Sequence, residues 1–271
     1  MNDKQRMKQA ASVFFDHFGA LPHKPDINSL GIIISHFSRI PWENLTKFLV
    51  KAQRLPAENR LRLADTVIRE HIENGAGGTC FSLTEALGTI LSFAGFHCHP
   101  VMADMNHGEN IHCALSVITG DGSRYLADPG YLVSVPVPLE TGQSPELEMY
   151  DDRLIWEPVD NGETYDLYTV NDSARNWKYR VRMNPVSPDA FTSHWQRSFD
   201  ATGMNSLHLN CRNGEGRLSA HNMNLRSVNA EGKKNEKLRD DYSEKIEAYF
   251  GLRRDIAQAA EREWIKSCRD R

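Results

Sequence analysis

The chain has 271 residues, of which 40% are hydrophobic and 25% are charged, a composition ordinary for a globular protein with a sizeable core. Its net charge of -4 excludes the strongly basic surface typical of nucleic-acid-binding proteins, and no apolar run reaches the roughly 20 residues that cross a bilayer. We therefore expect a cytoplasmic protein with no nucleic-acid partner and no membrane anchor, whose five scattered cysteines stay reduced.

The first 95 residues are predicted to be mostly helical. Apolar side chains recur at helical spacing over residues 4–18 and 26–40. A third helix precedes the glycines at 75–78, and its apolar face is Leu63, Val67, Ile68, His71 and Ile72. A fourth helix begins at Cys80 and ends at Gly95. Its apolar face is Leu83, Ala86, Leu87, Ile90, Leu91 and Ala94.

From Phe96 onward the period of the apolar residues changes to two, which is typical of β-strands. The predicted strands span 96–102, 111–118, 124–128, 132–139, 154–159, 166–170 and 177–183. A helix over 187–199, a hairpin of 206–211 with 217–221, and a charged helical region over 236–271 complete the chain. The polar stretch 229–237 contains Gly232 and is predicted to be a mobile loop.

A glycine-rich turn delivers Cys80 to the first position of the fourth helix. Thr79 can cap this helix, and the N–H groups and dipole at a helix N-terminus lower a cysteine pKa below its usual value of about 8.5. The alternative is a buried, inert thiol, because free cysteine is among the most buried residue types. Three glycines within four residues favour a nucleophile, since a core thiol needs no close approach of backbone or ligand.

The strand that contains His112 is followed by a glycine-containing turn and a second strand that ends at Asp128. If residues 120–122 form a three-residue loop, His112 lies opposite Gly130 and Asp128 becomes its diagonal neighbour on the same face. A two-residue turn would send the two side chains to opposite faces. The catalytic interpretation therefore requires an odd loop, and a loop of three or five residues suits a hairpin.

Cys80, His112 and Asp128 supply the side chains of a nucleophilic acyl-transfer site. A thiolate attacks an acyl carbon, an imidazole takes and returns the proton, and a carboxylate orients the imidazole. Each residue alone has a structural explanation, because strand histidines are often structural and an aspartate before Pro-Gly can start a turn. Together they favour catalysis.

Zinc binding is a competing interpretation of the same region, which concentrates several zinc-type side chains. These are His97, Cys98, His99, His107, His112 and Cys113. Their spacing contains no CxxC or HxxxH pair, so we expect no metal site.

Three segments resemble the arylamine N-acetyltransferase family: residues 77–81 (GGTCF), the hairpin 112–131, and residues 40–45 (IPWENL). The resemblance extends along nearly the whole chain. It implies an α+β fold with an N-terminal helical bundle, a central antiparallel β-barrel and a C-terminal α/β lid, on a catalytic core like that of cysteine proteases and transglutaminases. The expected domains are 1–95 with the nucleophile, 96–185 with the histidine and aspartate, and 186–271 as the lid.

The resemblance also implies a function. In this family Cys80 would take an acetyl group from acetyl-CoA and pass it to an arylamine, arylhydrazine or N-hydroxyarylamine in a ping-pong reaction. His112 and Asp128 match the other members of the family triad, and Trp42, Phe81 and Tyr131 are expected to contact substrate. Acetyl-CoA would be a co-substrate, with no permanently bound cofactor.

Several positions depart from the family pattern. Ala76 stands where an arginine is usual before Gly-Gly, so Glu43 either finds another partner or the wall of the site differs. Ser82 replaces a glutamate after Cys-Phe. Leu132 replaces a glycine and is expected to reshape the acceptor pocket beside Trp42.

Other functions share these residues. A transglutaminase-like amidase or protease uses the same order of Cys, His and Asp, and a family variant acts on carrier-protein thioesters. A non-catalytic binding protein that kept the scaffold is a third class. The sequence indicates neither the physiological acceptor, the CoA-binding residues nor an oligomeric state.

Overall fold

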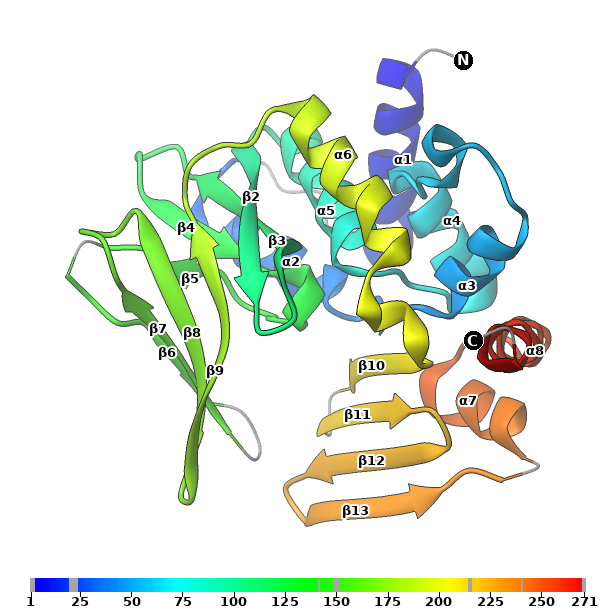
Figure 1. Cartoon of the computed structure of the whole chain (residues 1–271). Helices are drawn as coiled ribbons and strands as arrows, with labels where there is room; N and C mark the ends of the chain where they lie inside the picture. The colour runs from blue at the N-terminus through cyan, green and yellow to red at the C-terminus, as the bar shows by residue number, and fades with distance from the viewer. Residues whose placement is uncertain are drawn as a thin grey trace.

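The computed structural model describes residues 3–19, 24–140, 142–148, 152–213, 216–239 and 241–269. It combines N-terminal helices, a curled eight-stranded antiparallel sheet, and a five-stranded sheet with two C-terminal helices packed against it (Figure 1). The protein therefore has an α+β fold. Within the described ranges, no helix combines the length and apolarity needed to cross a membrane.

The N-terminal part is built around one buried helix. Its helices are α1 (Asp3–Phe18), α2 (Ile27–Phe37), α3 (Leu45–Ala52), α4 (Ala64–Asn74) and α5 (Cys80–Phe93). Helix α5 buries ten of its 14 residues, because α1, α2 and α4 cover one side of it and the curled sheet covers another. The position of Cys80 is thus fixed by packing on several sides of its helix.

The segment between residues 45 and 74 differs from the prediction of one helix. Helix α3 is additional, and the short 3-10 helix η1 (Ala57–Arg60), which follows Pro56, separates it from α4. Leu63 is the N-cap residue of α4, and Ile72 is exposed. The predicted apolar face therefore included Leu63, which lies just outside the helix. A cap residue can be apolar when it packs against a neighbour, as Leu63 does.

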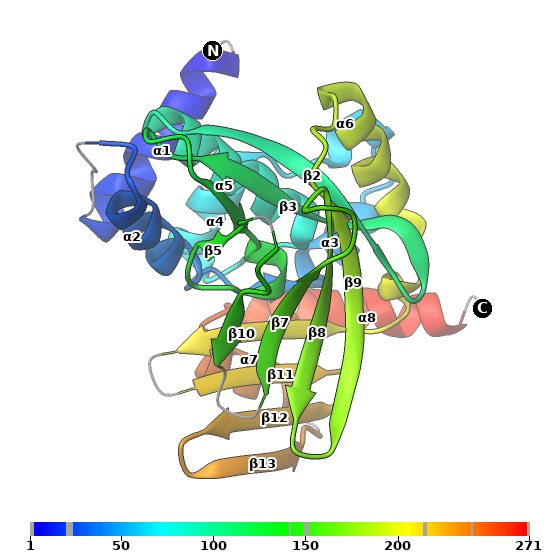
Figure 2. The ribbon, with the colours of Figure 1, turned by 90° about the vertical axis from the view of Figure 1, so that its left-hand side faces the viewer.

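The curled sheet has the strand order β5-β4-β3-β2-β9-β8-β7-β6 (Figure 2). Its strands are β2 (His97–Met105), β3 (Gly108–Ile118), β4 (Arg124–Ala127), β5 (Val137–Pro138), β6 (Glu146–Glu148), β7 (Arg153–Pro158), β8 (Thr164–Asn171) and β9 (Ala174–Arg182). The predicted antiparallel β-barrel is confirmed only in part: the sheet is curled into a half-barrel, but its edge strands β5 and β6 do not pair with each other. Both are very short, and Pro138 has no N–H to donate. The hollow of the sheet is filled by Trp156, Tyr165 and Tyr179.

The five-stranded sheet joins distant parts of the chain. Strand β1 (Trp42–Glu43) pairs with β10 (His208–Asn213), which is followed by β11 (Gly216–His221), β12 (Asn224–Asn229) and β13 (Gly232–Lys237). The mobile loop predicted at 229–237 is wrong, because residues 232–237 form β13 and pair with β12 along its whole length. This strand is polar because it is the outer edge of the sheet and is almost fully exposed.

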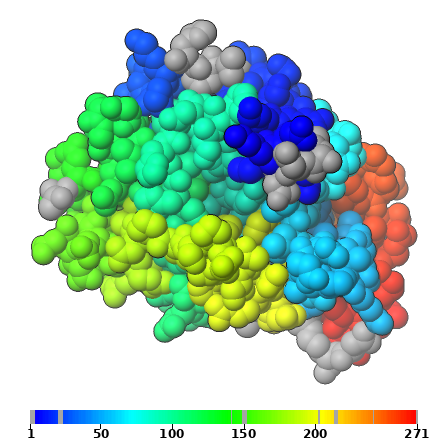
Figure 3. Space-filling view, turned by 90° about the horizontal axis from the view of Figure 1, so that it is seen from above, coloured from blue at the N-terminus to red at the C-terminus, as the bar shows by residue number. Residues whose placement is uncertain are grey.

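The remaining helices cover the two sheets. They are α6 (Pro188–Arg197), α7 (Tyr242–Phe250) and α8 (Arg254–Arg269), with the 3-10 helices η2 (Pro129–Tyr131), η3 (Ser198–Asp200) and η4 (Thr202–Asn205). Ser187 caps the N-terminus of α6, where the helix was predicted to start, and its hydroxyl accepts a hydrogen bond from Ala190 N. Seen from above, α6 (yellow) lies beside the α3–η1 segment (light blue), which it contacts through Phe191 and Trp195 (Figure 3).

Candidate active site

Cys80 is the first residue of α5 and is held by a turn that presses against the segment 41–43. A Cβ atom on Gly77 would lie 1.7 Å from the carbonyl oxygen of Pro41, so only glycine fits there. The expectation that these glycines permit a close backbone approach is confirmed. Thr79 occupies the N-cap position, but its side chain makes no capping hydrogen bond, contrary to expectation. The Thr79 hydroxyl therefore leaves the first N–H groups of α5 uncapped beside the thiol.

His112 and Asp128 meet through the pairing of β3 and β4. Ser116 pairs with Leu126, and Thr119 N donates to Ser123 O over 3.0 Å, which closes a three-residue loop. The odd loop required by the sequence argument is thus present. His112 Nε2 lies 3.0 and 3.1 Å from the two carboxylate oxygens of Asp128.

Asp128 is completely buried and is fixed from two sides. Tyr131 N donates to its Oδ1 over 2.9 Å, and the Tyr179 hydroxyl donates to the carboxylate as well. Tyr179 is itself held by Trp156, whose indole Nε1 donates to the Tyr179 hydroxyl oxygen over 3.0 Å. Sequence reasoning missed both aromatic residues, because their strands showed only an ordinary alternating pattern.

The nitrogen of His112 that faces Cys80 follows from these contacts. Because Nε2 is used by Asp128, Nδ1 is the nitrogen left for its hydrogen bond with the Cys80 thiol. Gly130 lies against both side chains, since a Cβ atom there would be 2.6 Å from Cys80 Cβ and 2.8 Å from His112 Cε1. Burial disfavours a charged imidazole, but the carboxylate of Asp128 and the Cys80 sulfur outweigh it and raise the pKa of His112 to about 10.

The surroundings of Cys80 favour its thiolate. A hydrogen bond from the Cys113 thiol, the hydrogen bond and charge of His112, and the charge of Lys47 together lower the pKa of Cys80 well below the value of a free thiol, against the opposing effect of burial. Burial and the neighbouring Cys80 raise the pKa of Cys113 in turn. The pKa shifts of Cys80 and His112 both favour a thiolate–imidazolium pair over the neutral thiol and imidazole.

Cys80 opens into a cavity of about 560 Å³ between the helices, the curled sheet and the β10–β11 edge. Trp42, Phe81 and Tyr131, the side chains expected to contact substrate, all line this cavity. It is also lined by residues that sequence reasoning missed, which are Asn44, Lys47, Ser198, Met204, His208, Asn210, Arg212 and Arg217. Asn44 lies in the segment 40–45 and Lys47 in α3, while the others come from the C-terminal part of the chain, where no motif marks them.

Arg62 takes the place of the absent motif arginine. Its Nη1 lies 3.8 Å from Oε1 of the buried Glu43 and donates to Gly77 O over 2.7 Å. Its Nη2 donates to Glu70 over 2.6 Å. Ala76 is completely buried and packs against the core of the C-terminal sheet. Glu43 thus finds another partner, and the same guanidinium braces the turn that carries Cys80.

The two other departures also have structural effects. The Ser82 hydroxyl donates to Thr79 O over 3.1 Å and occupies the space where a Cβ on Gly78 would lie. Leu132 is buried, lines the cavity and has a φ of +55°, a left-handed conformation that explains why glycine is usual at this position.

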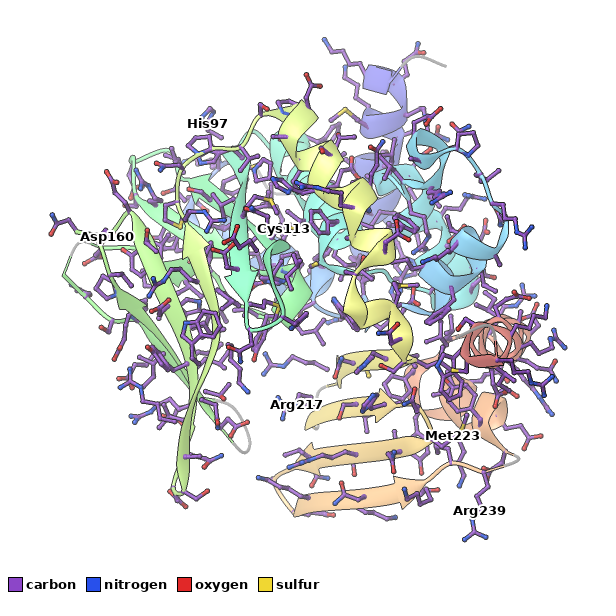
Figure 4. The ribbon with its side chains drawn as sticks, viewed as in Figure 1. His97, Cys113, Asp160, Arg217, Met223 and Arg239 are labelled. Carbon is purple, nitrogen blue, oxygen red and sulfur yellow. The ribbon has the colours of Figure 1, made fainter. Side chains whose placement is uncertain are left out.

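The zinc-type residues are dispersed in the structure. Figure 4 shows His97 at the outer side of the curled sheet and Cys113 in the interior beside α5. Cys98 donates to Gly88 O, and His107 lines the cavity. Over the described part of the chain, no three His, Cys, Asp or Glu side chains are grouped so that they could hold a metal ion.

Residues 26–259 match the model of a family described as N-acetyltransferase. The chain is similar in structure to arylamine N-acetyltransferase of Mycobacterium marinum, with a TM-score of 0.76 and 18% identity over 95% of this chain and 99% of that chain. The M. marinum enzyme in complex with CoA gives a TM-score of 0.75 and 17% identity over 93% and 98% of the two chains. The Salmonella typhimurium enzyme gives 0.75 and 15% over 93% and 97%. No curated protein sequence matches the chain significantly.

Proposed function

The chain belongs to the arylamine N-acetyltransferase family, and from this membership we propose that it transfers an acetyl group from acetyl-CoA to an arylamine, arylhydrazine or N-hydroxyarylamine through an acetyl-Cys80 intermediate. The observation that carries the proposal is the hydrogen-bonded series from Cys80 through His112 to Asp128 at the wall of a cavity. Cys80 is the nucleophile, His112 the general acid and base, and Asp128 the residue that orients the imidazole.

In the first half-reaction the Cys80 thiolate attacks the carbonyl carbon of the thioester. A carbon–sulfur bond to Cys80 forms, the bond to the sulfur of CoA breaks, and the imidazolium of His112 gives its proton to the departing CoA thiolate. The products are acetyl-Cys80, neutral His112 and CoA. Asp128 and Tyr179 hold the ring in one orientation throughout.

In the second half-reaction the amine nitrogen attacks the acetyl carbon of the new thioester. The nitrogen loses a proton to His112, the bond to Cys80 breaks, and the thiolate–imidazolium pair is restored. Trp42 and Tyr131 supply aromatic surface against which the acceptor ring can pack, and Phe81 also lines the cavity.

The division of the site over the chain fits this chemistry. We assign the nucleophile to the segment 1–95, the histidine and aspartate to 96–185, and the outer wall of the cavity to 186–271. A cysteine at a helix start beside a histidine on a sheet is also the arrangement of the cysteine-protease and transglutaminase core, and we place this site in that class.

The test is the intact mass of the protein after incubation with acetyl-CoA alone. We expect an added acetyl group on the wild type, none on Cys80→Ala, and loss of the group when an arylamine is added. Loss of the acetyl group at the same rate without an amine would identify a hydrolase instead. The absence of an adduct from a protein whose Cys80 also reacts slowly with iodoacetamide would refute the proposal.

A further inference from the structure

Lys47 is a buried cation at the active site to which the proposed reaction assigns no contact with substrate. It projects from α3, is 7% exposed, and lines the cavity together with Cys80. Its Nζ donates to the carbonyl oxygen of Ser198 over 2.8 Å and to the Ser198 hydroxyl over 2.7 Å, and lies 4.6 Å from the centre of the Phe199 ring. An ammonium group has three N–H donors, so one has no oxygen or nitrogen acceptor among the described residues.

Lys47 also has no carboxylate partner among the described residues, and the opposite charges near it are those of Cys80 and Asp200. In the described part of the chain no carboxylate lies within 4 Å of its Nζ, whereas the next lysine on the same helix, Lys51, pairs with Asp200 at 3.0 Å. Burial lowers the pKa of Lys47 to about 8 despite the nearby Cys80 thiolate, so the group is still mostly protonated at pH 7. A buried ammonium group that pairs with no carboxylate costs free energy, part of which an anionic ligand would recover.

The charged side chains that line the cavity are also positive. Lys47, Arg212 and Arg217 line it, and no aspartate or glutamate does so among the residues that the structure describes. This contrasts with the chain's net charge of -4. The two arginines lie farther out. Arg212 donates to Leu132 O, and Arg217, labelled in Figure 4 at the end of β11 that faces the curled sheet, lies 3.9 Å from Asp152.

We propose that the active site selects a substrate that carries a carboxylate, and that Lys47 binds this carboxylate. The inference rests on the proposed acyl transfer and names the substrate class of that site. The ammonium group can donate its remaining N–H to a carboxylate oxygen. This hydrogen bond would be charge-assisted, and the low dielectric constant of the buried cavity wall would strengthen it. The carboxylate makes and breaks no covalent bond, and the transfer at Cys80 proceeds as described above.

The carboxylate has two sources, the acyl chain of the thioester or the ring of the amine. Donors are compared by the rate at which succinyl-CoA and butyryl-CoA, which differ in a terminal carboxylate against a methyl group, add their acyl groups to Cys80. Acceptors are compared by the affinity of the Cys80→Ala protein for 4-aminobenzoate and for the neutral 4-aminobenzamide. Because each pair shares the rest of the molecule, the ratio within a pair reports the carboxylate alone.

We expect the wild-type chain to favour the carboxylate by about tenfold or more in one of the two pairs, which identifies the source. Lys47→Met should reduce that ratio to near one, and Lys47→Arg should retain much of it. Lys51→Met is the matched control, because Lys51 does not line the cavity, and its ratio should equal that of the wild type. Circular dichroism of each variant verifies folding.

Ratios near one in both pairs for the wild type would overturn the inference, as would a carboxylate preference that survives in a folded Lys47→Met. Effects of Lys47 on the thiolate itself cancel in the ratios. If no CoA thioester modifies Cys80, the proposed acyl transfer fails, but the binding comparison with 4-aminobenzoate still decides the role of Lys47.

Discussion

Arg62 serves a buried carboxylate and the catalytic turn with a single guanidinium. It lies 3.8 Å from Glu43 and donates to Gly77 O, two residues before the turn reaches Thr79. When a buried carboxylate loses its positively charged partner, most of the free-energy cost of its desolvation is no longer offset. The position of an arginine in the sequence therefore matters less than the atoms that its guanidinium reaches.

Replacing Arg62 by methionine should lower the free energy of unfolding by about 3–5 kcal/mol, since Glu43 would stay buried without a positive charge. The acylation rate of Cys80 should fall as well, because Gly77 loses its brace. Urea denaturation measures the first effect. Arg69→Met is the control, because Arg69 is exposed and its ion pair with Glu70, at 3.9 Å, contributes little to stability. Equal stability of the two variants would mean that Glu43 does not depend on Arg62.

The pH dependence of Cys80 follows from two opposite shifts. The pKa of the Cys80 thiol is lowered, so its alkylation by iodoacetamide should lose rate only when the pH falls through this lowered pKa, well below the range of a free thiol. The pKa of His112 is raised to about 10, so acyl transfer should decline only above that pH, when the imidazolium has no proton for CoA. Cys113 and Lys47, whose pKa is about 8, also act on the Cys80 thiol, and both stay the same when the wild type is compared with a His112 variant.

His112→Gln should move the alkylation midpoint upward toward that of an ordinary thiol. A wild-type midpoint near pH 9, or no movement in the variant, would show that His112 does not stabilise the thiolate.

At the scale of elements, the short helix η2 brings the chain back against the nucleophile. Gly130 lies in η2, where a Cβ would be 2.6 Å from Cys80 Cβ and 2.8 Å from His112 Cε1. Such contacts force the two catalytic side chains apart, and a displacement of about 1 Å can cost on the order of 100-fold in rate.

We therefore expect Gly130→Ala to reduce the rate of Cys80 acylation by about 100-fold while the secondary structure stays intact. Gly142→Ala serves as the control for glycine replacement, with nothing within 4 Å of the added Cβ, although its positive φ adds a small strain. Acylation by mass and circular dichroism are measured together. A Gly130→Ala protein with wild-type acylation would contradict the proposed geometry.

The elements were predictable where a period or a turn constrained them. The three-residue loop at 120–122 settles which side chains share a face, so the meeting of His112 with Asp128 could be derived from parity. Strand β13 could not, because an exposed edge strand carries no apolar alternation. Lys47 and Arg62 were also missed, since no local pattern reports which distant oxygen a long side chain reaches.

At the scale of the whole molecule, Asn44 connects the first part of the chain to the last. Its Nδ2 donates to Gly203 O over 3.0 Å and to Ser206 O over 2.8 Å, and its Oδ1 accepts from His208 N over 2.8 Å. These contacts keep β1 against β10 and hold the cavity wall in place. The sequence placed Asn44 in a family motif but did not indicate its partners.

Asn44→Ala should lower the free energy of unfolding by about 2–4 kcal/mol, because three backbone groups lose the hydrogen bonds that the buried Asn44 side chain makes to them. Denaturation in urea measures the loss, and Asn59→Ala, an exposed asparagine, is the control. We also expect weaker binding of CoA thioesters, measured on Cys80→Ala, as the wall moves. A stability loss below 0.5 kcal/mol would mean that the pairing of β1 with β10 holds without this side chain.

The pairing of β1 with β10 also sets an order of events during synthesis. Glu43 meets Leu209, which leaves the ribosome 166 residues later. At 5–20 residues per second this is a delay of about 8 to 33 s. The ribosome thus synthesises Cys80, His112 and Asp128 before β10. The reactive thiol is therefore present well before the cavity wall that later shields it. During that interval the growing polypeptide depends on the reducing power of its surroundings to protect its own nucleophile.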